Sequence, residues 1–71
     1  MATTALRRGV VTAFDDDAGL GEITGDDGAV IGFQCTRIAD GSRTIAVGTD
    51  VAFLIAPGHR GLWEAVAVDP I

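Results

Sequence analysis

Residues 9–35 of the 71-residue chain read GVVTAFDDDAGLGEITGDDGAVIGFQC, and the predicted fold follows largely from this segment. It holds three short segments rich in valine, isoleucine and phenylalanine, residue types that favour strands. Glycines and aspartates interrupt the segments too often for an average helix and are typical of turns. We therefore predict strands over residues 9–14, 20–24 and 29–35, with a hairpin turn at residues 25–28.

Two further segments of the same kind follow, over residues 50–56 and 64–68. Alternation at every second residue places Ile23 and Phe33 on the side of their strands that faces a core. The connection over residues 36–48 is long enough to hold a single helical turn. Five short strands with one long middle connection predict an all-β fold, a small five-stranded antiparallel barrel of the OB type, whose closure hides the strand edges.

The length and composition indicate one globular domain over residues 1–71, with its core at about residues 8–68. Hydrophobic residues make up 48% of the chain and charged residues 21%, which are values of globular proteins. Ten acidic residues stand against five arginines, with no lysine, so the net charge is −5. The field of the whole molecule repels polyanions, which disfavours non-specific binding to nucleic acid.

Cys35 is the only cysteine, which excludes an internal disulfide and a zinc site built from cysteines. The chain has no apolar run long enough for a signal peptide or a membrane span, so we expect a cytoplasmic location. The aspartates at residues 15–17 and 26–27 lack the alternating ligands of a calcium loop. His59 is the sole histidine and has no catalytic partners in the sequence. We expect neither an enzyme nor a cofactor.

The order and spacing of several segments resemble those of the bacterial cold-shock proteins, from about Arg8 to Val68. GVVTAFD at residues 9–15 is similar to the family's first strand. AGLGEI at residues 18–23 resembles the family's first ribonucleoprotein motif, KGFGFI, and IGFQCTRI at residues 31–38 resembles its VFVHFSAI segment. The resemblance implies the same OB-type barrel and the binding of single-stranded RNA or DNA by stacking of bases on aromatic side chains.

This chain departs from the family at most of the positions that the resemblance assigns to ligand binding. Those positions carry Ala13, Ala18, Leu20, Glu22, Gly32, Gln34 and Cys35 in place of aromatic, histidine or lysine side chains, and only Phe14 of the stacking set is retained. Each stacked base contributes about 1–3 kcal/mol to binding, so the inherited mode is expected to be weakened. Glu22 adds a carboxylate in the middle of the former platform, where phosphates would approach.

The nucleic-acid contacts that we predict are Phe14, Gln34, Arg43, Arg60 and Trp63. Trp63 follows the loop that resembles the family's last loop, and its indole would replace a lost stacking platform. The alternative is that Trp63 forms a half-buried lid over one end of the barrel. The arginines supply phosphate contacts if they converge on one face, and are otherwise a solvated surface.

A second interpretation, of a different class, is a protein–protein interaction module that kept the barrel and lost nucleic-acid binding. Such a module would present Leu20, Leu54 or the acidic loops to its partner. Ala52, Leu54 and Ala56 form a second apolar face of the fourth strand. We expect a monomer, or a dimer if that face is used for pairing.

Overall fold

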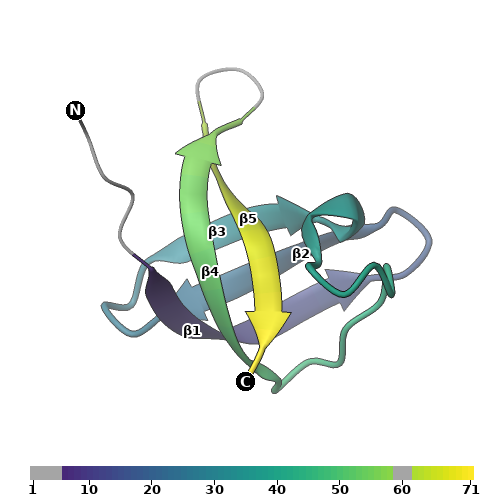
Figure 1. Ribbon diagram of the computed structural model, residues 1–71, viewed down its shortest axis with the longest axis horizontal. Helices are drawn as coiled ribbons and strands as arrows, with labels where there is room; N and C mark the ends of the chain where they lie inside the picture. The colour runs from purple at the N-terminus through teal and green to yellow at the C-terminus, as the bar shows by residue number, and fades with distance from the viewer. Residues whose placement is uncertain (1–5, 59–61) are drawn as a thin grey trace.

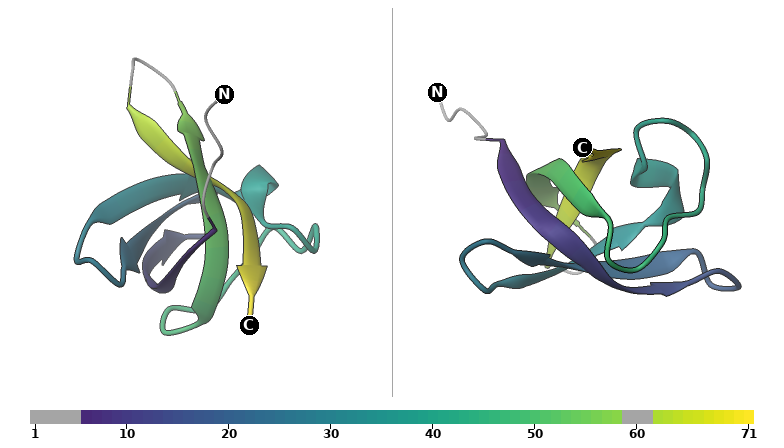
Figure 2. Two further views of the ribbon diagram at one scale, coloured as in Figure 1. Left: turned by 60° about the vertical axis from the view of Figure 1, so that its left-hand side comes forward. Right: turned by 90° about the horizontal axis from the view of Figure 1, so that it is seen from below.

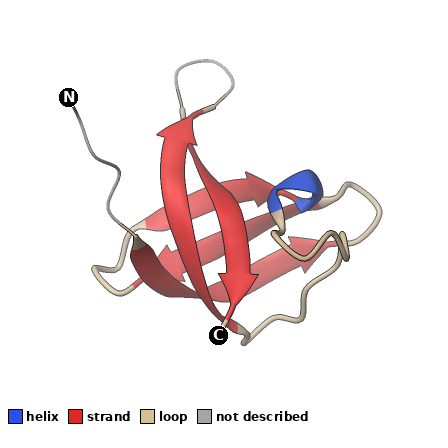
Figure 3. Cartoon of the chain, viewed as in Figure 1, coloured by secondary structure: helices blue, strands red, loops and turns tan. Residues whose placement is uncertain are grey.

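The computed structural model describes residues 6–58 and 62–71, in which five strands close into a barrel (Figure 1). The strands are β1 (Arg7–Asp15), β2 (Leu20–Gly25), β3 (Val30–Gln34), β4 (Asp50–Pro57) and β5 (Trp63–Pro70). One turn of 3-10 helix, η1 (Cys35–Arg37), follows β3 and is blue in Figure 3. All five predicted strands are confirmed, and their ends lie within two residues of the predicted ones.

The strands follow one another around the barrel in the order β1-β2-β3-β5-β4. Four neighbouring pairs are antiparallel, whereas β3 and β5 run parallel through the pairing of Gly32 with Glu64. The OB-type barrel is therefore confirmed, but the predicted purely antiparallel arrangement is wrong at this one joint. A closed ring with an odd number of strands cannot alternate direction throughout, so one parallel pair is unavoidable.

Strands β1 to β3 form a curved meander, and the β4–β5 hairpin crosses in front of it (Figures 1 and 2). The connection between η1 and β4 is held by β5 and β1. In this connection Ile38 bridges to Val68, and the N–H of Ala39 donates to the carbonyl oxygen of Val68 at 2.7 Å. Near its end the N–H of Gly48 donates to the carbonyl oxygen of Val11, also at 2.7 Å.

The hydrophobic core fills the space between the meander and the hairpin. Its largest completely buried side chains are Val11, Ile23, Val51, Phe53 and Val68. The alternation read from the sequence is confirmed, because Ile23 and Phe33 are buried and Cys35 is partly buried against the same cluster. The predicted hairpin turn is also present, with the N–H of Gly25 donating to the carbonyl oxygen of Ala29 at 2.8 Å. The described helical residues include no segment long and apolar enough to cross a membrane.

Candidate functional site

A shallow, open groove of about 540 Å³ lies across strands β1, β2, β3 and β5. Residues of these four strands line it together with Gly58 and Leu62: Ala13, Phe14, Asp15, Leu20, Gly21, Glu22, Gly32, Phe33, Gln34, Gly58, Leu62, Trp63 and Glu64. The face of strands β2 and β3, with the loops beside it, is where OB-type barrels bind their ligands. The groove is therefore the candidate functional site.

Small side chains create the hollow. Ala13, Glu22, Gly32 and Glu64 stand in one register row across β1, β2, β3 and β5. A Cβ atom placed on Gly32 would meet only one atom within 4 Å, the carbonyl oxygen of Gly21 at 3.8 Å. The space above Gly32 is consequently open, and the Glu22 side chain stands between the two smallest residues of the row.

A pair of stacked phenylalanines supports one side of the groove. The rings of Phe14 and Phe33 lie 6.0 Å apart between centroids, with an angle of 17° between their planes. Phe33 belongs to the core and is 2% exposed, whereas Phe14 is half-buried against that core. Offset stacking of this kind fixes the orientation of Phe14. The part of Phe14 that lines the groove is thus a rigid apolar surface.

Three large apolar side chains of the groove are exposed, namely Leu20, Leu62 and Trp63. Trp63 has 65% of its surface accessible, so the alternative of a half-buried lid over the barrel end is wrong. Exposure of a large aromatic side chain beside other apolar residues is typical of a binding surface. Trp63 is the first residue of β5 and pairs with Pro57, the last residue of β4, whereas the first buried residue of β5 is Ala65.

The three carboxylates of the groove have different surroundings. Asp15 Oδ1 accepts the backbone N–H groups of Asp17 and Ala18, at 3.0 and 3.2 Å, and so shapes the β1–β2 turn. Glu64 has a side chain only 14% exposed, and its Oε1 accepts from Arg37 Nε at 3.0 Å. The Glu22 carboxylate is exposed, and no donor in the described part of the chain bonds to it.

The structure brings together three of the five residues predicted to contact nucleic acid. Phe14, Gln34 and Trp63 all line the groove. Arg43 does not line it, since it lies in the connection between η1 and β4, with a φ of 62°. Arg60 lies outside the described residues, in the segment that joins two groove residues.

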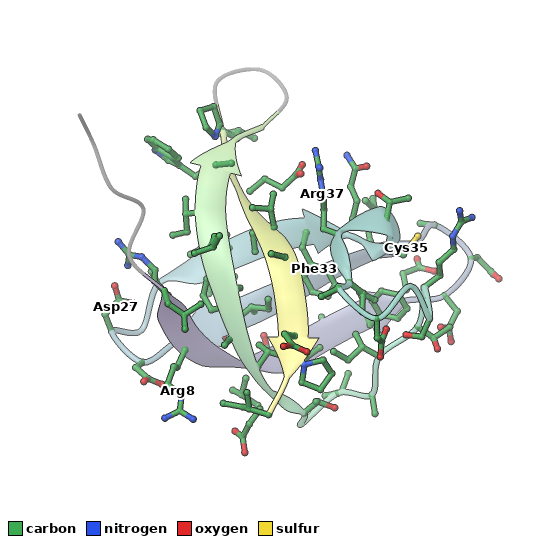
Figure 4. All side chains as sticks on the ribbon, in the orientation of Figure 1. Arg8, Asp27, Phe33, Cys35 and Arg37 are labelled. Atoms are coloured by element: carbon green, nitrogen blue, oxygen red, sulfur yellow. The ribbon has the colours of Figure 1, made fainter. Side chains whose placement is uncertain are left out.

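The arginines of the described residues are dispersed rather than gathered at the groove. Arg7 pairs with Asp27 at 3.4 Å, with both side chains at least half exposed. Figure 4 shows Arg8 and Asp27 on one side of the β4–β5 hairpin and Arg37 on the other. Within residues 6–58 and 62–71, no arginine lines the groove. These residues therefore form no convergent basic patch at the groove.

Sequence reasoning missed one groove residue, Leu62, and one ion pair that holds a groove residue. Leu62 was overlooked because it lies outside the predicted strands, and no local pattern places it beside β2 and β3. The Arg37–Glu64 pair joins residues 27 positions apart, and only the parallel pairing of β3 with β5 brings them together. Searches against protein-family models and against curated proteins found no match for this chain.

Proposed function

We propose that the chain is a divergent cold-shock-like protein that binds single-stranded RNA or DNA weakly, with contacts to bases rather than to phosphates. One observation carries the proposal: Phe14, Gln34 and Trp63, three of the nucleic-acid contacts predicted from the sequence, line a single groove. That groove lies on the face by which OB-type barrels bind oligonucleotides. The proposal is of a binding protein and not of an enzyme, and the single cysteine favours a cytoplasmic location for it.

Charge decides how such binding would work. Three carboxylates line the groove, and only that of Glu64 is paired with an arginine, Arg37. No cationic side chain of the described residues lines the groove itself, so phosphate groups would find little electrostatic attraction there. Stacking does not depend on charge, because every base presents a π face to an aromatic side chain. Two aromatic platforms, each contributing about 1–3 kcal/mol, support weak binding. The affinity should accordingly depend only slightly on salt.

The experiment is a fluorescence titration, since Trp63 is the only tryptophan and the chain has no tyrosine. Oligonucleotides of about seven nucleotides, in RNA and DNA forms, should quench Trp63 at low salt. Phe14→Ala should weaken binding several-fold as judged by the Trp63 signal, and Trp63→Ala should do so in an NMR titration. Arg43→Ala serves as the control and should leave the affinity unchanged, because Arg43 does not line the groove. Absence of binding to every strand would refute the proposal.

A second candidate is the protein–protein interaction module. The dispersed arginines and the three groove carboxylates favour it, because an acidic groove with exposed Trp63 and Leu62 suits a basic, partly apolar segment of another protein. The same titration separates the two candidates. Quenching by an arginine-containing peptide, with no response to any oligonucleotide, would support the protein partner.

A further inference from the structure

Glu22 occupies the middle of the groove in a way that suits an acceptor for a ligand. Its neighbours in the register row are Ala13 on β1 and Gly32 on β3, so no bulky side chain flanks it. It is exposed, and the described part of the chain offers its carboxylate no hydrogen-bond donor. Glu64, the other glutamate of the row, is by contrast held by Arg37 at 3.0 Å. Glu22 is thus the carboxylate of this row that remains available.

An ionised carboxylate only accepts hydrogen bonds, through two oxygens held side by side. The Watson–Crick edge of guanine presents two adjacent donors, N1–H and N2–H, which match those two oxygens. Adenine and cytosine present one amino donor next to an acceptor nitrogen. The lone pair of that nitrogen would repel the second oxygen of the carboxylate. Uracil and thymine present one N–H between two carbonyl oxygens. A carboxylate on a stacking surface therefore distinguishes guanine from the other bases.

We propose that Glu22 reads the Watson–Crick edge of a guanine seated in the groove, so that the protein prefers strands that contain an unpaired guanine. The inference rests on the proposed function and names the base that the site selects. The open space above Gly32 gives the base edge room, because a Cβ there would have only one neighbour within 4 Å. Trp63, with 65% of its surface accessible, offers the stacking face on the same groove. Glu22 then favours one base while its charge disfavours phosphates.

The test uses thymidine heptanucleotides whose central base is guanine, hypoxanthine, adenine, cytosine or thymine, titrated against Trp63 fluorescence. Hypoxanthine is guanine without the N2 amino group, so it removes one of the two donors and leaves the rest of the base unchanged. We expect the guanine strand to bind about tenfold more tightly than the hypoxanthine strand, the discrimination of one bidentate contact. In Glu22→Gln, the guanine and hypoxanthine strands should bind with nearly equal affinity.

Removal of a negative charge also raises affinity for any polyanion, so a control for charge is needed. Asp16→Asn removes the same charge in the β1–β2 turn, outside the lining of the groove. It should raise the affinity for all five strands slightly and leave the guanine preference intact. Glu22→Gln should instead raise the affinity for the thymine strand and abolish the preference.

The outcomes separate this inference from the proposed function. Equal binding of the guanine and hypoxanthine strands, or a preference that survives Glu22→Gln, would overturn the role of Glu22 while leaving nucleic-acid binding in place. Absence of binding to all five strands and to their RNA counterparts would overturn both. Quenching by acetyl-arginine amide, without a response to any strand, would assign the Glu22 carboxylate to a cationic protein partner and would likewise overturn both.

Discussion

The ring of Phe33 covers Gly21 on the neighbouring strand so closely that a side chain there has no room. The two residues are register partners across β2 and β3, and a Cβ atom on Gly21 would lie 2.6 Å from both Cε1 and Cζ of Phe33. The same Cβ atom would lie 2.9 Å from the backbone carbonyl oxygen of Ala13. Phe14 stacks on the same ring, so Phe33 has little freedom to move aside. The packing of Phe33 between β2 and β3 therefore requires glycine at position 21.

Gly21→Ala should destabilise the protein by about 1–3 kcal/mol, the usual cost of overpacking a core. Gly32→Ala is the matched control, one strand away and outward-facing, with its nearest new contact at 3.8 Å. Neither glycine has a positive φ, so the comparison isolates the steric contact. Urea unfolding followed by circular dichroism measures both variants. Equal stability of the two would show that the Phe33 ring can move.

Phe53→Ala should cost about 3–5 kcal/mol, because Phe53 is completely buried and its removal leaves a large cavity. A loss of that size removes much of the stability of a typical small domain, so the variant should be largely unfolded near room temperature. Trp63→Ala, at an exposed position, should change the free energy of unfolding by less than about 0.5 kcal/mol. A large loss for Trp63→Ala would instead give Trp63 a structural role and contradict its assignment to binding.

The Arg37–Glu64 pair should contribute about 0.5–1 kcal/mol to stability, measured as the coupling in a double-mutant cycle with Arg37→Ala and Glu64→Gln. Glu64 is mostly buried, which limits screening, but Arg37 is half exposed and loses side-chain entropy. The Arg7–Asp27 pair, at 3.4 Å and exposed on both sides, should give a coupling near zero. Added salt should weaken the coupling between Arg37 and Glu64 only modestly. A coupling for Arg7–Asp27 that equals that of Arg37–Glu64 would contradict the role of burial.

Asp40 should titrate below its ordinary range. The backbone N–H of Ser42 donates to Asp40 Oδ1 at 2.9 Å, and this hydrogen bond lowers the pKa of Asp40 from 3.8. A depressed pKa in the folded state means that the ionised form stabilises the fold above the unfolded pKa, and that this contribution is lost as pH falls through the folded pKa. Asp40→Asn should therefore reduce the loss of stability in acid. NMR titration of the carboxyl carbon measures the pKa, and a value at or above 3.8 would be inconsistent with this hydrogen bond.

The positions of the strands could be predicted because their signals are local. Glycine and aspartate at the turns and alternation within the segments depend only on neighbouring residues, and so Ile23 and Phe33 were placed correctly on the core side. The single parallel pair could also have been deduced, since five strands closed into a ring require one. The purely antiparallel arrangement was wrong because it considered only the hairpins between consecutive strands and not the pairing of β3 with β5 that closes the ring.

The five strands, their buried faces and the acidic balance of the molecule are encoded locally, because they follow from backbone propensity, alternation and composition. Which residues share the groove depends instead on the closure of the barrel. Closure places Trp63 in the same groove as Phe14 and Gln34, leaves Arg43 outside it, and brings Glu64 to Arg37. The groove combines strands that are distant in the chain, and the pairing of β3 with β5, which no local pattern predicts, brings these strands together.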